Sequence, residues 1–315
     1  MPQLCESSTV PSALRWPFRA RSAVRLASVS SAILLASGVF LALGIVADAA
    51  WLLTGNRAWV EVVFRVPGAL LMALLALTEL WLSVRVLRQY SPGEPMRTAW
   101  WPIAFSAGCD LAGTVCVQVL GVESPLNPAP VSAASAFRQF GLVVGGPCRF
   151  ALLAAGLYFA LRVYRRSGFL GRLNALDWAV LGPIAVYIGV EAGGLILAVE
   201  RGKRPGMGEA LNWPVNPLLW VLLVEAMMLY RSVQKMGPGW IGWCWKAFSA
   251  AVFLVALGDI GTWATAYGYL PWPWAAAVWS IWVPAGAAFA LAPAYQLQAI
   301  QYAYSGRTSA ADAVA

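Results

Sequence analysis

The sequence contains no histidine, and only 11% of its 315 residues are charged. The absence of histidine excludes zinc or haem held by histidine and nucleophiles activated by a Ser-His or Cys-His pair. The five cysteines form no C-x-x-C pair, so structural disulfides and a redox motif are not expected. Phosphate-binding G-x-x-x-x-G-K and nucleophile G-x-S-x-G motifs are also missing. We therefore expect no cofactor and no metal, and an enzyme is the less favoured interpretation.

Hydrophobic residues make up 60% of the chain, too many for a water-soluble surface. They form runs of about twenty residues, the length that a helix needs to cross a hydrocarbon layer. The fold predicted from these runs is all-α, a polytopic integral membrane helix bundle with about eight transmembrane helices. The predicted spans are residues 29–53, 66–87, 100–120, 140–161, 178–199, 217–229, 247–267 and 274–299.

The distribution of Lys and Arg predicts the orientation of this bundle. Basic residues concentrate in the amino-terminal arm and in every second loop, which places both termini in the cytoplasm. The expected organisation is a basic arm at residues 1–28, a bundle at 29–303 and a short tail at 304–315, in the inner (cytoplasmic) membrane of a bacterium. This pattern also explains the net charge of +8 without nucleic acid. A cleaved signal peptide ending near Ala47-Asp48-Ala49 is the alternative for the first span, although it would be unusually long.

The 17 tryptophans predict two interfacial belts, because the amphipathic indole settles at the headgroup level. The expected inner belt is Trp100, Trp101, Trp178, Trp240, Trp243 and Trp245, and the expected outer belt is Trp51, Trp59, Trp213, Trp272 and Trp274. Two glycine pairs at a spacing of four predict close contacts between helices: Gly141 with Gly145, and Gly189 with Gly193.

The second and sixth predicted spans share an acid, a basic residue six positions later and a Pro-Gly turn. The matched residues are Glu79, Arg85 and Pro92-Gly93 in one span, and Glu225, Arg231 and Pro238-Gly239 in the other. The third and seventh spans each contain Ala-Phe-Ser-Ala, followed by Asp110 and by Asp259. This pattern favours a duplicated four-helix unit at residues 29–163 and 175–303, and parallel repeats are one plan of transporters. The alternative is chance similarity among apolar segments.

Ionisable residues inside the membrane cost about 2.5–3.5 kcal/mol each and usually serve a function. At 1.5 Å per residue, Asp110 and Arg149 fall near mid-depth on consecutive antiparallel helices, which predicts an ion pair. Four more acids fall at nearby depths: Glu79 and Glu225 toward the cytoplasm, Glu191 and Asp259 toward the outside. We expect these six residues to line a polar cavity that relays protons or binds a cation. The alternative is that the acids only hydrogen-bond neighbouring helices.

Three functions fit these features. The favoured one is a proton- or cation-linked carrier of a small molecule, and the second is a non-catalytic accessory or sensory module. The third is an intramembrane lipid-modifying enzyme that uses paired carboxylates as acid and base. An aspartate in the third and in the seventh span loosely resembles the lysoplasmalogenase-like membrane family, with little matching beyond Gly258-Asp259. Expected partners are membrane lipids, a small-molecule, proton or cation ligand, and further copies or other subunits of an oligomer.

Overall fold

The computed structural model describes residues 21–56, 58–120, 136–202, 214–235, 240–266, 269 and 274–312. Within these ranges all regular structure is helical, and the segments join into eight continuous helices. They are α1 (Arg21–Thr54); α2 (Ala58–Val63) running through the π-helical η2 (Phe64–Gly68) into α3 (Ala69–Gln89); α4 (Pro95–Thr114) with η3 (Val115–Val119); α5 (Ala136–Val143) running through η5 (Val144–Cys148) into α6 (Arg149–Arg166); α7 (Ala175–Glu200); α9 (Val215–Gln234); α10 (Trp240–Ala266); and α11 (Trp274–Asp312).

Six of the described helices are long and apolar enough to cross a membrane, so the predicted all-α membrane bundle is confirmed. Each predicted span overlaps one helix, and most helices are longer than the apolar run inside them. The other two helices are α9 and α11, which carry polar residues such as Glu225 and Gln296. Both pack against several neighbours, α9 against α6, α7 and α10, and α11 against α1, α3 and α10.

Helix α1 shows how the apolar residues divide between the core and the surroundings. Its buried positions recur every three or four residues, which gives one narrow seam along the helix: Leu26, Ser30, Ile33, Ser37, Phe40, Gly44, Ala47 and Trp51. This helix packs against α11 and α2. On the opposite side Leu35 and Leu53 are 70% and 86% exposed. A continuous exposed apolar face of this kind is suited to hydrocarbon and not to water.

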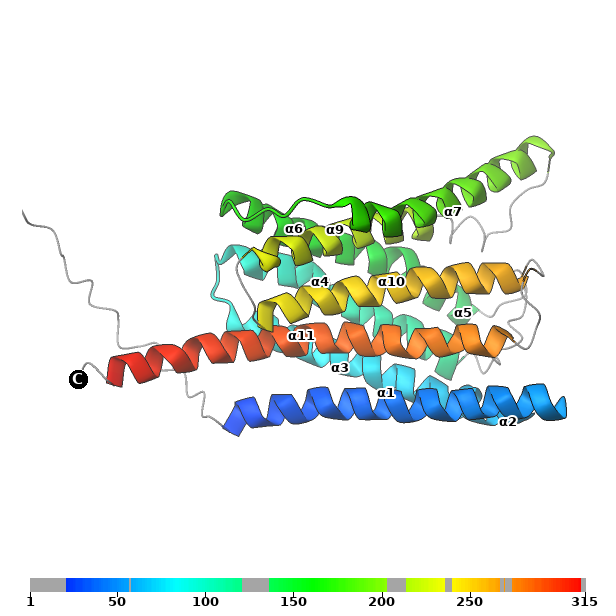
Figure 1. Cartoon of the computed structure of the whole chain (residues 1–315), viewed down its shortest axis with the longest axis horizontal. Coiled ribbons are helices and arrows are strands. Elements are labelled where there is room, and N and C mark those ends of the chain that lie inside the picture. Colours follow the sequence, from blue (N-terminus) through cyan, green and yellow to red (C-terminus); the bar gives the residue numbers. More distant parts are fainter. Residues whose placement is uncertain are drawn as a thin grey trace, which may run out of the picture.

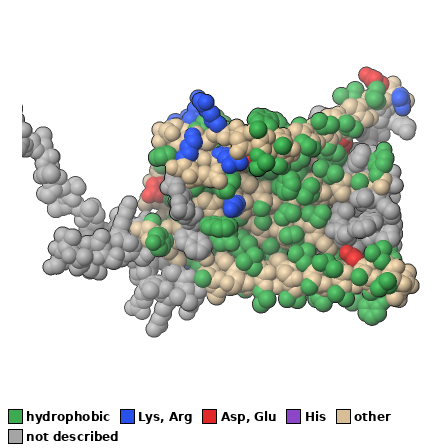
Figure 2. Space-filling view, in the orientation of Figure 1, with side chains coloured by type: hydrophobic (Ala, Val, Ile, Leu, Met, Phe, Trp, Pro, Cys, Tyr) green, Lys and Arg blue, Asp and Glu red, His purple; other side chains and the backbone are tan. Residues whose placement is uncertain are grey.

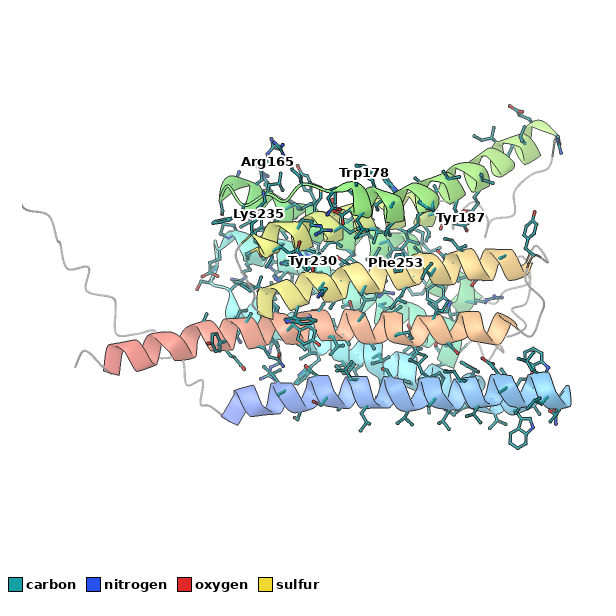
Figure 3. The ribbon with its side chains drawn as sticks, in the orientation of Figure 1. Arg165, Trp178, Tyr187, Tyr230, Lys235 and Phe253 are labelled. Atoms are coloured by element: carbon teal, nitrogen blue, oxygen red, sulfur yellow. The ribbon has the colours of Figure 1, made fainter. Side chains whose placement is uncertain are left out.

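The helices run nearly parallel to one another, as Figure 1 shows. Helix α7 diverges from the bundle toward its carboxyl end, and α11 extends beyond the other helices at its own carboxyl end. Hydrophobic side chains cover the middle of the visible face, whereas Lys and Arg gather toward one end (Figure 2). Arg165 and Lys235 both lie there (Figure 3). We call it the basic end, and its residues include Arg85, Arg88, Arg162, Arg165, Arg166, Arg231, Lys235 and Lys246.

A cluster of aromatic rings from several helices lies in the core. Trp245 stacks on Phe248 with ring centroids 5.7 Å apart, and Phe248 also contacts Trp100 at 6.2 Å and Phe289 at 6.3 Å. The indole nitrogen of Trp245 donates a hydrogen bond to the Tyr164 hydroxyl at 3.1 Å. Four helices, α4, α6, α10 and α11, therefore meet on these five rings.

This cluster corrects the interfacial role predicted for two tryptophans. Trp100 and Trp245 are fully buried, because their rings fill the space between helices, and Trp51 of the predicted outer belt is only 8% exposed. Trp101, Trp178 and Trp243 are exposed, as a belt requires. Trp213 and Trp272 lie outside the described residues. A count of tryptophans near helix ends cannot separate these two roles, since burial depends on which side of the helix the indole faces.

Candidate functional site

The ion pair predicted from depth is present. Nη1 of Arg149, the first residue of α6, lies 2.6 Å from Oδ1 of Asp110 on α4. On the other side of the guanidinium, Nη2 lies 3.7 Å from Oε2 of Glu79 on α3. The carboxyl groups of Glu79 and Asp110 also interact electrostatically with each other. These three residues, here called the triad, join three helices through two acids and one base.

Glycines bring the helices of the triad together. A Cβ placed on Gly113 would lie 2.5 Å from the Cα of Gly145 and 3.0 Å from the carbonyl oxygen of Gly141, so the backbones touch with no side chain between them. Gly113 follows Asp110 by three residues and Gly145 precedes Arg149 by four, about one helical turn in each case. The predicted close contact of Gly141 and Gly145 is therefore confirmed, and it sets the distance at which the ion pair forms.

The second glycine pair behaves differently. Gly189 and Gly193 on α7 have no atom within 4 Å of an added Cβ, so the predicted contact is wrong. The reason is the divergence of α7, which carries this part of the helix away from the bundle (Figure 1). The spacing of small residues identifies a face that permits close packing, but it does not supply a partner.

Irregular helix geometry flanks the triad on two of its three helices. The π-helical η5 ends at Cys148, immediately before Arg149, and contains Pro147. The π-helical η3 begins at Val115, five residues after Asp110. A π-helical turn replaces the regular i to i−4 ladder with wider hydrogen bonds, and such turns are frequent at functional sites. The helices are therefore irregular where the charges meet.

The triad is flanked by aromatic rings, and some of its buried polar atoms make no hydrogen bond. The guanidinium carbon of Arg149 lies 4.4 Å from the ring centroid of Phe289 on α11 and 5.5 Å from that of Phe150. Glu79 is 2% exposed and Arg149 is 8% exposed. Oε2 of Glu79 and both Nε and Nη2 of Arg149 are buried without a hydrogen-bond partner among the described residues. Buried donors and acceptors without partners are costly, so a bound water molecule, proton or polar group at these atoms would be stabilising.

The remaining predicted site residues form other polar groups. Glu191 on α7 accepts a hydrogen bond from the side-chain amide of Asn216 on α9. Asp259 on α10 interacts electrostatically with Glu191. Glu225 on α9 is partly buried, and its Oε2 has no hydrogen-bond partner within the described ranges. The expected single cluster of five acids around Arg149 is thus divided, because depth along a helix does not specify which neighbour a side chain faces.

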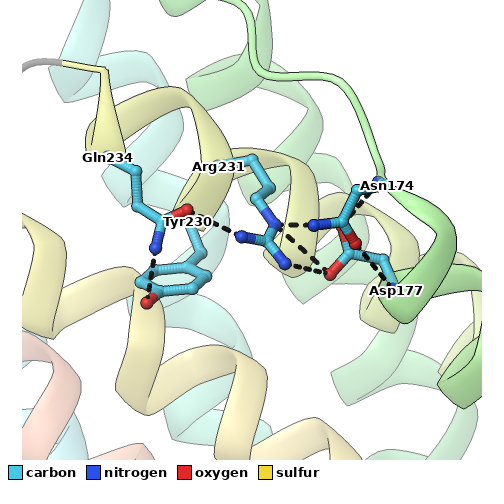
Figure 4. A network of polar contacts seen from close by, with 5 residues as sticks. All are labelled: Asn174, Asp177, Tyr230, Arg231 and Gln234. Atoms are coloured by element: carbon cyan, nitrogen blue, oxygen red, sulfur yellow. Dashed lines mark hydrogen bonds and ion pairs between the residues drawn. The ribbon is translucent and has the colours of Figure 1, made fainter.

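A second ion pair, which the sequence did not reveal, lies at the basic end. The Arg231 guanidinium donates to both carboxylate oxygens of Asp177, through Nε at 2.9 Å and Nη2 at 2.7 Å (Figure 4). Asp177 also accepts from the backbone N–H of Asn174, whose side chain accepts from the Asp177 N–H in return. This capping box begins α7 and fastens its first turn to the end of α9.

The segment before α7 is held to the same end of α9 by a buried hydrogen bond. The backbone N–H of Gly171 donates to Oγ of Ser232 at 2.8 Å, and Ser232 is completely buried. We expect Ser232→Ala to lower the free energy of unfolding by about 1–2 kcal/mol, since it leaves that N–H without an acceptor. Thermal unfolding in detergent measures the change. Ser167→Ala is the control, because the Ser167 hydroxyl bonds an exposed carbonyl, and an equal loss in both variants would contradict the assignment.

No protein-family model, curated protein or solved structure matches this chain. The triad is the group of side chains on which a functional proposal can be based. Sequence patterns identified all three residues of the triad but missed two residues that surround it, Phe289, which covers the guanidinium, and Gly113, which permits the close approach. Gly113 had a visible signal, since it follows Asp110 on the same helix face, whereas nothing in the sequence links Phe289 to Arg149.

Proposed function

We propose that this chain is a proton-linked carrier that moves a small molecule across the membrane. The observation that supports this best is the buried triad of two carboxyl groups and one guanidinium. One guanidinium balances one carboxylate. The other carboxyl group must then bind a proton or another cation, or remain an uncompensated charge, which is strongly unfavourable in a buried site. A site of this composition can take up and release a proton as its surroundings change.

The irregular helices beside the triad support a binding site whose helices change conformation during transport. Transporters commonly place their binding residues where membrane helices are interrupted, and the freed backbone groups line the site. Here η3 follows Asp110, and η5 with Pro147 precedes Arg149. Gain or loss of a proton would change the attraction between α4 and α6 at the point where both helices bend most easily.

The packing of the helices supports the duplicated four-helix unit. Helix α3 packs on α11 and helix α9 packs on α6, so the second helix of each proposed copy contacts the last helix of the other. Within each copy the second helix packs on the third and the third on the fourth. A reciprocal arrangement of this kind is expected for two parallel repeats related by an axis along the membrane normal.

Proteoliposomes loaded with a pH-sensitive dye test the carrier directly. Small solutes, including amino acids, sugars and amines, are added outside one at a time, and the change in internal pH is recorded. We expect at least one solute to drive proton movement, and we expect Asp110→Asn to reduce that flux at least about a hundredfold, the loss typical of removing a proton-transfer group. Asp259→Asn tests whether the second polar group contributes.

Glu94→Gln is the control for this assay, because Glu94 is an exposed acid in the turn before α4. It should leave the flux unchanged. Equal flux in the parent protein and in both aspartate variants would overturn the carrier proposal.

A non-catalytic accessory or sensory module is the second candidate. The observation that favours it is the separation of Glu191, Glu225 and Asp259 from Arg149, which leaves the triad alone inside a packed core. This function predicts that no solute drives proton movement, although the triad still stabilises the fold. The intramembrane lipid-modifying enzyme stays a prediction from the sequence, and no contact among the described residues favours it over the other two.

A further inference from the structure

An open groove lies on α3 toward the basic end. Its volume is about 600 Å³, and it is lined by Leu77, Leu80, Trp81, Val84, Arg85 and Arg88. Leu77 is 50% exposed and Trp81 is 46% exposed. The apolar part of the groove therefore faces outward from the bundle, and the two arginines lie one to three turns closer to the helix end.

The matching face of α9 is covered. Matching Glu79 to Glu225 pairs Leu77 with Leu223 and Leu80 with Ala226, and these two α9 residues are 1% and 0% exposed. Helix α7 packs on α9, whereas α1 packs on α11 and α2 and leaves this part of α3 open. The groove thus occupies a face that the corresponding helix buries inside the protein.

The matching arginines of α3 and α9 also differ in whether they have a partner. Arg231 is paired with Asp177, but Arg85, which matches it, makes no ion pair within the described part of the chain. Arg88 likewise makes no ion pair with any described residue. The Arg85 guanidinium instead lies 4.9 Å from the ring centroid of Trp81, which fixes it at the mouth of the groove. Neither arginine has an anionic partner among the described residues, so both guanidinium groups are available to an anion from outside them.

We propose that this groove binds an anionic phospholipid, with its phosphate at Arg85 and Arg88 and an acyl chain along the apolar wall. An arginine pair beside an exposed apolar surface at a membrane interface supplies the two features that such a lipid requires, positive charge for the headgroup and hydrocarbon contact for the tail. The interaction goes beyond the proposed carrier function and does not depend on it.

Native mass spectrometry of the full chain, released from detergent containing equal amounts of phosphatidylglycerol and phosphatidylcholine with identical acyl chains, tests the site. We expect the parent protein to retain phosphatidylglycerol preferentially. Each arginine near an anionic lipid contributes about a factor of five, so the double variant Arg85→Gln/Arg88→Gln should lower that preference by about 25-fold. Both side chains are at least partly exposed, and the variant should therefore fold normally.

Arg162→Gln/Arg165→Gln is the matched control, because it removes two exposed arginines from the same end of the bundle, on α6. It should leave the preference unchanged. Equal losses in the two double variants would overturn the proposal, since they would indicate a general attraction to the basic end. Equal retention of both lipids by the parent protein would also overturn it, as would a second copy of the chain that covers the groove in a lipid-free dimer.

Discussion

Replacing Arg149 with methionine is expected to lower the free energy of unfolding by about 3–5 kcal/mol, because it leaves the Glu79 and Asp110 carboxyl groups together in the core without a cation. Methionine retains much of the side-chain volume beside Phe289, so the loss reports mainly on charge. Thermal unfolding in detergent, calibrated against chemical denaturation, measures the change. The effect should be among the largest for any single substitution in the chain.

Two comparisons separate charge from packing in this experiment. Arg162→Met, at an exposed position on α6, should change the stability by less than about 0.5 kcal/mol. The triple variant Glu79→Gln/Asp110→Asn/Arg149→Met should recover a large part of the loss, since it removes the buried charges together. A triple variant no more stable than Arg149→Met would contradict this explanation and indicate that the guanidinium acts mainly through packing.

Replacing Gly113 with alanine is expected to cost about 3 kcal/mol or more. The new methyl group would meet backbone atoms of Gly145 and Gly141, and backbone cannot move aside as a flexible side chain can. The helices must then separate, which lengthens the Asp110–Arg149 contact one turn away. The variant should therefore also lose most of the solute-driven proton flux.

Gly189→Ala is the matched control, with the same added methyl group on a helix face that has nothing within 4 Å. It should be neutral or stabilise the protein by up to about 1 kcal/mol, because alanine favours the helix over glycine. Similar effects of the two glycine substitutions would show that the contact between α4 and η5 does not position the ion pair.

The positions of the helices could be predicted from the sequence because hydrocarbon imposes a minimum length on each apolar run. The predicted spans accordingly locate every described helix. Helix ends were less predictable: α11 continues to Asp312, inside the segment assigned to the tail, because polar helical turns outside the membrane leave no mark in an apolar run. The Pro92-Gly93 turn was predictable, and Gly93 has a φ of 92°, a conformation that glycine adopts without strain.

The sequence predicted the depth of each candidate site residue along its helix but, apart from the Asp110–Arg149 pair, not which residues contact one another. Counting residues from the helix ends placed Asp110 level with Arg149, and they do pair. The same count placed Glu225 at the depth of Glu79, yet Glu79 contacts Arg149 and Glu225 does not, even though α9 packs on α6, the helix that carries Arg149. Which neighbours a helix contacts depends on packing between segments that are distant in the sequence. The spacing of residues within one helix does not reveal those neighbours.

Exchange of charges between Asp110 and Arg149 tests most directly whether these two residues form the pair that unites α4 and α6. Asp110→Arg and Arg149→Asp are each expected to destabilise the protein strongly, because like charges then meet in the core. The double exchange restores one positive and one negative group at the same contact, so it should be more stable in thermal unfolding than either single variant. A double variant whose loss equals the sum of the two single losses would contradict the triad as the centre of this protein.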